Sequence, residues 1–215
     1  MIIGAQKCGT SAMWHSLCAN PSVSKTRKEK RFFCLDSEYE KGLPYYSQKF
    51  SSYKKLNGDA TPAYLFSEVT PERVFDVIPD IKLIVSFRNP TDRAYSQYHH
   101  AKQKLGGLSF EEALKEKKDL IKRGLYAHQM KNWLQFFPME SFLIIDFMDL
   151  GKDFAKTMSE IETFIGAEQF GVDIAGKRFT NYPPMRSDTR KELDDFFTPH
   201  NEELFELIQR RFQWE

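Results

Sequence analysis

The chain has few cysteines, no long apolar run and almost no net charge, and each shortage argues against a class of protein. Its 215 residues contain 3 cysteines, an odd number in a chain too long to need a disulfide framework, so we expect reduced thiols. No stretch approaches the roughly 20 apolar residues of a membrane-spanning helix. The net charge of +1 argues against a protein that coats nucleic acid or an anionic membrane.

The length favours one domain. A chain of 215 residues can bury roughly 70% of its unfolded surface, which is enough for a sizeable core, so we expect a single domain over residues 1–215. The sequence opens on an apolar segment without a charged-then-apolar leader. We therefore expect a cytoplasmic protein that binds neither membranes nor nucleic acid. The sequence does not indicate an oligomeric state.

The first eleven residues have the order of a phosphate-binding loop. A short apolar run passes into a small-residue turn and then into a helix-like segment. Glycines in such a turn let the backbone approach a ligand, and the N–H groups at the start of the next helix point at an anion. We predict that the Lys7 ammonium and the loop that follows it bind phosphate groups. The other residues of the predicted cradle are Cys8, Gly9, Thr10 and Ser11.

The place of the lysine separates this loop from that of ATP-dependent enzymes. The common phosphate loop ends in Gly-Lys-Ser/Thr, whereas here Lys7 precedes Gly9. An ATP site also needs an acidic residue at the end of a second strand to help hold magnesium, but the strand predicted over residues 81–87 is followed by Arg88. The pattern favours a nucleotide with a phosphate that the protein grips directly, and it predicts no metal site.

Five stretches in order resemble the 3'-phosphoadenylyl sulfate (PAPS)-dependent sulfotransferases, closest to the heparan sulfate 3-O- and N-sulfotransferase branch and its bacterial-type relatives. They are residues 2–10, 28–33, 61–64, 88–96 and 129–138. The resemblance implies transfer of a sulfuryl group from PAPS to a hydroxyl or amine of a glycan or other small acceptor, with 3',5'-ADP (PAP) as product. Golgi relatives carry a membrane anchor before the first strand, so an upstream anchor would place this protein in the Golgi lumen.

The resemblance also implies a general base. Glu29 falls where the related glycan enzymes keep this carboxylate, inside a run that holds five cations over residues 24–31. An attacking hydroxyl or amine must lose a proton, and a carboxylate within hydrogen-bond reach can take it. With Lys7, Glu29 forms the predicted catalytic pair. The residues implied for acceptor binding are Lys28, Arg31, Thr61 and Pro62.

The far end of the nucleotide has its own implied contacts. By resemblance, Arg88 and Ser96 hold the 3'-phosphate that distinguishes PAPS from ATP, because Arg88 leaves the carboxyl end of a predicted strand, where open α/β sheets bind ligands. Relatives place a late loop over the same phosphate and the adenine. This suggests the same role for Lys177 and Arg178.

Three residues depart from the glycan enzymes. Arg31 replaces a histidine, Cys34 replaces an aspartate, and Ala60 replaces a lysine that helps to grip the substrate. All three changes concern acceptor contacts, so they question a heparan-like acceptor and leave the transfer chemistry unaffected.

Strands alternate with helices along the chain, which predicts an α/β fold. We expect a P-loop-like three-layer arrangement with a central parallel sheet of four to five strands flanked by helices. The predicted strands are the first residues, a short segment near 55–58, and residues 81–87 and 142–147. A single helix is expected over about 109–123, and two final helices over about 188–197 and 201–212.

Two other functions fit parts of the pattern. One is a P-loop kinase that uses ATP and magnesium, and the other is a nucleotide-binding domain of the same fold that has lost turnover. Selective stabilisation of the protein by 3',5'-ADP, and not by ATP-magnesium, would exclude the kinase. Release of PAP from PAPS would exclude the domain that has lost turnover.

Overall fold

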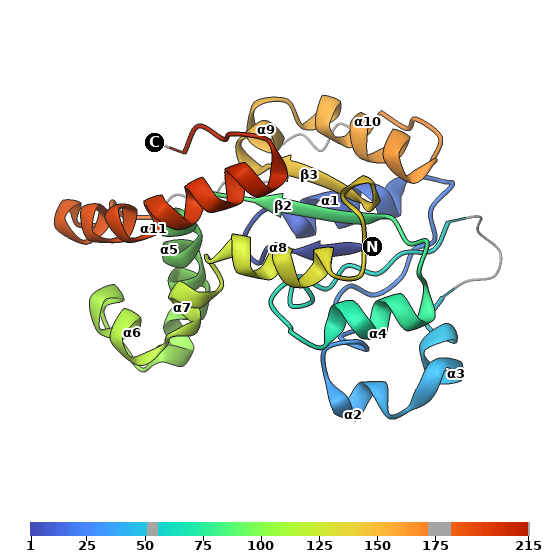
Figure 1. Cartoon of the computed structure of the whole chain (residues 1–215), viewed down its shortest axis with the longest axis horizontal. Coiled ribbons are helices and arrows are strands. Elements are labelled where there is room, and N and C mark those ends of the chain that lie inside the picture. The colour runs from blue at the N-terminus through green and yellow to red at the C-terminus, as the bar shows by residue number, and fades with distance from the viewer. Residues whose placement is uncertain (51–55, 172–181, 215) are drawn as a thin grey trace.

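A parallel sheet lies at the centre of the computed structural model, which describes residues 1–50, 56–171 and 182–214 (Figure 1). Its strands are β1 (Ile2–Gly4), β2 (Leu83–Phe87) and β3 (Phe142–Asp146), in that spatial order. Both neighbouring pairs are parallel. Every residue of β2 is buried, as expected for a central strand covered on both faces.

Helices cover the sheet, and some of them lie beyond one of its ends. They are α1 (Thr10–Ala19), α2 (Asp36–Tyr39), α3 (Gly42–Ser47), α4 (Thr70–Val77), α5 (Pro90–Ala101), α6 (Phe110–Glu116), α7 (Asp119–Lys122), α8 (Tyr126–Leu134), α9 (Phe147–Lys152), α10 (Phe154–Ile165) and α11 (Ser187–Ile208). The described residues also form the short 3-10 helices η1 (Lys102–Leu105) and η2 (Met139–Ser141). No helix within the described ranges combines the length and the apolar character needed to cross a bilayer.

The strand side chains alternate between two apolar layers, as the pleat of a sheet requires. On one face Ile84 packs with Met13 of α1 and Ile161 of α10. On the other face Val85 packs with residues of α4, α8 and α11, among them the fully buried Trp133. The predicted α/β arrangement of a parallel sheet between helices is therefore confirmed.

The predicted number of four to five strands is wrong, because the described residues form three. In and just after the segment predicted near 55–58, Leu56 and Ala60 make only isolated parallel bridges. After Ala60 pairs with Ile2, the chain turns: the Tyr64 N–H donates to the Thr61 carbonyl at 3.0 Å. Pro62 is the second residue of this turn, where its fixed φ is favourable, so the segment leaves β1 before a ladder can form.

Two helix predictions also differ from the structure. The helix expected over 109–123 is divided at Lys117, whose φ of −112° and ψ of 78° end α6 before α7 begins. The two final helices are one, because α11 continues through Pro199. The Thr198 hydroxyl donates to the Asp194 carbonyl at 2.7 Å, so one carbonyl of this turn is bonded by a side chain.

The turn after β2 places α5 at the carboxyl edge of the sheet. The Asn89 side chain accepts hydrogen bonds from the N–H groups of Thr91 and Asp92 at 2.9 and 3.3 Å, and Pro90 occupies the first turn of the helix. Both features favour a helix start. Arg88 is thereby fixed between the end of β2 and the beginning of α5.

Candidate functional site

The loop from β1 to α1 is shaped by residues with positive φ. Gly9, at the N-cap of α1, has φ of 80°, and a Cβ added there would lie 2.9 Å from Leu150 Cδ1. A side chain at this position would therefore be both strained and crowded. Lys7 also has positive φ, 71°, and its half-buried side chain lies at the carboxyl edge of the sheet.

The start of α1 offers free backbone donors. Within the described part of the chain, the N–H groups of Gly9, Thr10 and Ser11 make no hydrogen bond, as is usual for the first turn of a helix. The Cys8 N–H is partly engaged, since it donates to the Ala5 carbonyl at 3.3 Å. The Cys8 thiol is fully buried, and burial raises its pKa to about 11, so any ligand contact from Cys8 comes from its backbone.

Lys7 and Arg88 come from different strand ends but lie near one another. Burial lowers the pKa of Lys7, the Tyr182 hydroxyl opposes this shift, and the Arg88 guanidinium lowers the pKa further. Arg88 is held by its guanidinium and by its backbone: the guanidinium lies 4.8 Å from the ring centre of Phe147, and the carbonyl accepts a hydrogen bond from the Tyr126 hydroxyl at 3.0 Å. Two cations that repel each other form a ready site for an anion.

Ser96 lies on α5, two turns after Arg88. Its side chain is 4% exposed, and its Oγ lies 3.5 Å from the Tyr182 hydroxyl. The Tyr182 ring stacks on His99 with ring centres 4.2 Å apart. Because the same tyrosine affects the pKa of Lys7, it connects the predicted contacts of the two ends of the nucleotide. No sequence feature marks Tyr182 beyond its position in a late loop.

Glu29 stands opposite the phosphate loop, on an exposed turn. Its carboxylate accepts a hydrogen bond from the Arg31 guanidinium at 3.0 Å and lies 3.7 Å from the Lys28 ammonium. Lys28 in turn donates to the Ser11 hydroxyl at 2.8 Å, and burial together with the charge of Lys7 lowers its pKa while Glu29 raises it. Lys28 thus bridges the predicted base and the predicted phosphate cradle.

Backbone strain is concentrated at these residues. Among the described non-glycine residues, those with positive φ are Lys7, Glu29, Arg31 and Gln209. Left-handed backbone is unfavourable for such side chains and persists where the surrounding structure holds it in place, commonly at functional sites. Three of the four, Lys7, Glu29 and Arg31, lie in the predicted site. We call these three residues the strained unit.

Thr61 and Pro62 are buried beneath this turn and do not face solvent. The Thr61 hydroxyl donates to Asp59 at 2.8 Å and accepts from the Arg31 N–H at 3.4 Å. Asp59, itself 2% exposed, also accepts from the hydroxyls of Tyr46 and Tyr64 at 3.1 and 2.8 Å. These bonds give Thr61 a supporting position below the turn that carries Glu29.

Replacing Asp59 with alanine should lower the free energy of unfolding by about 3 kcal/mol or more, because three buried hydroxyls lose their acceptor. Urea unfolding followed by circular dichroism would measure the loss. The matched control is Tyr46→Phe, which removes one of these hydrogen bonds and should cost about 1 kcal/mol. Equal losses in the two variants would show that Asp59 does not organise the cluster.

His100 joins the site although the sequence reading did not place it there. The charge of Lys7 is the main cause that lowers the pKa of His100, followed by burial, while Glu29 raises it. The exposed histidine is therefore close enough to both groups for their charges to act on it. A periodic reading could have found it, because His100 follows Ser96 by four residues and shares its helix face.

The remaining predictions concern two cations of a late loop and the absence of a metal site. Lys177 and Arg178 fall outside the described residues. The acidic residue at the carboxyl edge is Asp146 of β3, separated from β1 by β2 and occupied by hydrogen bonds from Met148 N–H and Trp214 Nε1 at 3.0 and 3.4 Å. Across the described ranges, no three His, Cys, Asp or Glu side chains gather in a metal-binding arrangement.

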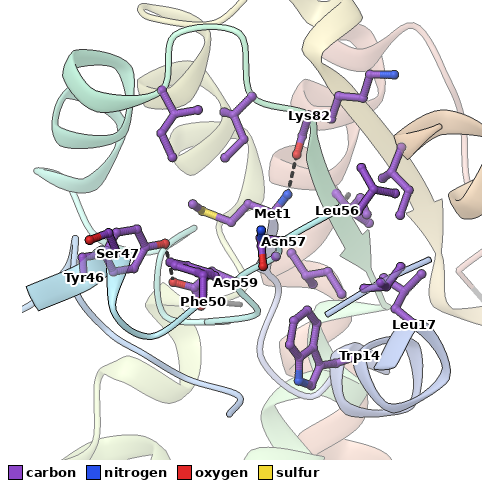
Figure 2. A pocket seen from close by; sticks show the side chains of 17 residues that line it. Met1, Trp14, Leu17, Tyr46, Ser47, Phe50, Leu56, Asn57, Asp59 and Lys82 are labelled. Carbon is purple, nitrogen blue, oxygen red and sulfur yellow. Dashed lines mark hydrogen bonds between the residues drawn. The ribbon is translucent and has the colours of Figure 1, made fainter. Parts of the chain in front are cut away.

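An apolar cavity of about 620 Å³ opens near the other end of β1 (Figure 2). Met1, Trp14 and Leu56 are among its lining residues. None of the lining residues belongs to the phosphate loop, to the turn that carries Glu29 or to α5. Size and apolar character do not make it the nucleotide site, which needs converging donors and positive charge.

Comparison with known proteins gives a family match over most of the chain. The model of the sulfotransferase domain matches residues 1–194. The chain is 30% identical to the human bifunctional heparan sulfate N-deacetylase/N-sulfotransferase 3, over 98% of this chain and 30% of that protein. It is 26% identical to the mouse heparan sulfate glucosamine 3-O-sulfotransferase 5, over 100% of this chain and 73% of that protein.

A solved structure gives the same result at the level of the fold. The sulfotransferase from Alicyclobacillus acidocaldarius superposes with a TM-score of 0.87 and 29% sequence identity, over 98% of this chain and 95% of that one. The chain thus spans nearly all of this relative but only 30% of the bifunctional human enzyme.

Proposed function

The chain belongs to the sulfotransferase-domain family, and on that premise we propose that it transfers a sulfuryl group from PAPS to a hydroxyl or amine of a glycan. The observation that carries the proposal is the strained unit of Lys7, Glu29 and Arg31, together with Lys28, which joins the Glu29 carboxylate to Ser11 of the phosphate loop. It sets a carboxylate opposite a phosphate loop, as proton removal beside a phosphate-linked leaving group requires. The kinase alternative is not favoured by the family match.

The phosphate loop would bind the 5' end of the donor. Lys7 and the free N–H groups of Gly9, Thr10 and Ser11 would bind the 5'-phosphosulfate. During transfer the bond from sulfur to the 5'-phosphate oxygen breaks and negative charge grows on that oxygen. Fixed donors aimed at developing charge lower the barrier because they need no reorganisation.

The 3'-phosphate would lie between Arg88 and Ser96. A guanidinium can donate two parallel hydrogen bonds to a phosphate, and a serine hydroxyl can donate a third. The lowered pKa of Lys7, caused by burial and by Arg88, supports a site that is short of negative charge until the nucleotide binds. Tyr182, beside Ser96, would contact the same end. Our proposal extends this role to Lys177 and Arg178.

Glu29 would act as the general base on the acceptor. The acceptor oxygen or nitrogen attacks sulfur in line with the leaving phosphate oxygen, a new bond to sulfur forms, and the acceptor proton passes to the Glu29 carboxylate. The products are the sulfated acceptor and PAP. Arg31 and Lys28 hold the carboxylate by charge, and both would bind acceptor groups beside it.

The acceptor side differs from the pattern of the glycan enzymes in ways that the structure makes concrete. Arg31 is exposed and bonded to Glu29, whereas Ala60 is completely buried beside Ile2. Cys34 is half-buried and donates to the Arg31 carbonyl at 3.6 Å. Acceptor selection would therefore depend on Arg31 and on the basic turn, with Thr61 and Pro62 supporting that turn from below.

Thermal stability with nucleotides tests the proposal. At a concentration of about 100 times its Kd, 3',5'-ADP should stabilise the protein by about 2.7 kcal/mol, which raises the Tm by about 5 °C or more. ATP with magnesium at the same concentration should have little effect. A larger shift with ATP-magnesium would contradict the proposal, and so would stabilisation by 3',5'-ADP without PAP release from PAPS across a panel of glycan acceptors.

A further inference from the structure

The apolar cavity near the amino end of β1 lies away from the residues proposed to bind nucleotide or acceptor (Figure 2). Its volume of about 620 Å³ falls within the usual range of small-ligand sites, roughly 300–1,000 Å³. Lys82 lines the cavity just before β2, and Arg88 follows the other end of that strand. Six residues of extended chain span about 20 Å, so the cavity and the nucleotide contacts lie at opposite edges of the sheet.

Three aromatic side chains that line the cavity are held in place by other contacts. The Lys30 ammonium lies 5.5 Å from the ring centre of Trp14 and 4.7 Å from that of Phe50. Lys30 is itself turned into the interior, where it is 8% exposed and donates three hydrogen bonds at 2.8–3.2 Å. The Tyr46 hydroxyl donates to the Asp59 carboxylate at 3.1 Å. Because these contacts fix the rings, the cavity is formed before a ligand enters, which reduces the cost of binding.

The interior of the cavity favours an uncharged, apolar ligand group. Asp59 is a lining residue, but its carboxylate is 2% exposed and already accepts hydrogen bonds from three hydroxyls. Such a lining binds an alkyl chain well, because the chain leaves water without needing a hydrogen-bond partner. Much of the remaining lining is branched and aliphatic: Leu17, Val23, Ile78, Ile81, Ile84 and Ile165.

The exposed lining residues are polar and carry one positive charge. They are Ser47, Asn57 and Lys82, so none of the exposed side chains in the described lining is acidic. Among the described residues, the Lys82 ammonium has the Phe164 carbonyl as its hydrogen-bond acceptor and no carboxylate. The ammonium and the Asn57 amide can both donate to carboxylate oxygens, and the single charge of a carboxylate matches that of Lys82.

We propose that this cavity binds a long-chain carboxylate, with the alkyl chain among the aliphatic residues and the carboxylate at the rim beside Lys82. The site is separate from the proposed sulfuryl transfer, because neither PAPS nor the acceptor takes part in it. Each methylene that leaves water should strengthen binding about fourfold, until the chain fills the cavity.

Calorimetry with octanoate, decanoate and dodecanoate, each below its micelle concentration, tests the alkyl part. The Kd should fall about tenfold for each two methylenes added. A Kd that does not fall with chain length, or no binding of any of the three, overturns the proposal. Adding saturating 3',5'-ADP should change each Kd less than twofold. Competition between the two ligands would place the carboxylate at the phosphate loop and would overturn the proposal as well.

The variant Lys82→Glu tests the rim, with decanoate compared against decan-1-ol. The Kd for decanoate should rise about tenfold at low salt, since the reversal turns an attraction into a repulsion. The Kd for the uncharged alcohol should stay within about twofold. An equal effect on the two ligands, or no effect on either, overturns the assignment of Lys82. The matched control is Lys117→Glu, the same reversal at an exposed residue between α6 and α7, which should change neither Kd.

The variant Leu56→Trp tests the cavity itself, because the larger ring would occupy part of the space that Leu56 lines. It should raise the Kd for decanoate and for decan-1-ol at least tenfold, while circular dichroism shows a folded protein. Unchanged binding in the folded variant would place the chain elsewhere on the molecule. If this variant does not fold, the chain-length series and the exposed Lys82 still decide the question.

Discussion

Replacing Glu29 with glutamine should lower kcat for sulfuryl transfer by a factor of about 10²–10⁴. Glutamine keeps the size of the side chain and can still accept a hydrogen bond from Arg31, but it cannot take the acceptor proton. The measurement is the initial rate of PAP release with saturating PAPS and acceptor. The Kd for 3',5'-ADP, measured by calorimetry, should change less than about threefold, because the carboxylate lies opposite the phosphate loop.

The control for this prediction is Glu40→Gln. Glu40 is exposed and follows α2, so its loss removes the same charge without approaching the reacting atoms, and kcat should be unchanged. An equal loss of kcat and of 3',5'-ADP affinity in the Glu29 variant would remove Glu29 from the role of base. It would then be a residue that shapes the site through its bond with Arg31.

The core of the fold could be predicted from local patterns. β2 is a continuous apolar run, and burial on both faces requires just such a run. The helix expected to begin near residue 109 does begin there, with a capping box whose hydrogen bonds run in both directions between Ser109 and Glu112. These features depend on residues close in sequence, which is why the strand and the start of the helix were predicted at nearly the right places.

The failed predictions depend on distant contacts. Ala60 lies beside Ile2 as a strand would, but whether a ladder continues depends on the turn that Pro62 begins. Two final helices were predicted, yet α11 is a single helix that continues through Pro199. Helix α11 packs against α5 and α8. Such packing often outweighs the local helix propensity of single residues.

The candidate site was only partly readable for the same reason. Lys7 and Arg88 follow predicted strands, and parallel strands end at one edge, so their meeting could be expected. The positive φ values of Glu29 and Arg31 could not, because no glycine or asparagine marks them. Nor could the inward turn of Lys30, which depends on the carbonyl of Gly58, far along the chain.

Replacing Arg88 with alanine should raise the Kd for 3',5'-ADP by about 100-fold, the usual cost of removing one partner from a desolvated, charge-assisted pair. The Kd for 5'-AMP, which lacks the 3'-phosphate, should rise less than about threefold. Calorimetry at fixed pH and salt would measure both. The half-buried guanidinium already lies against the Phe147 ring, so little side-chain entropy is lost when phosphate binds. The free energy of the hydrogen bonds to phosphate therefore contributes to the affinity with little reduction.

The difference between the two nucleotides decides the role of Arg88, since a general loss of structure would weaken both. Arg211→Ala is the matched control: this exposed arginine pairs with Glu202 on α11, and its removal should change neither Kd. Equal weakening of 3',5'-ADP and 5'-AMP by Arg88→Ala would mean that Arg88 does not read the 3'-phosphate. Its effect would then come from its repulsion of Lys7, and the preference for a doubly phosphorylated adenosine would need another cation.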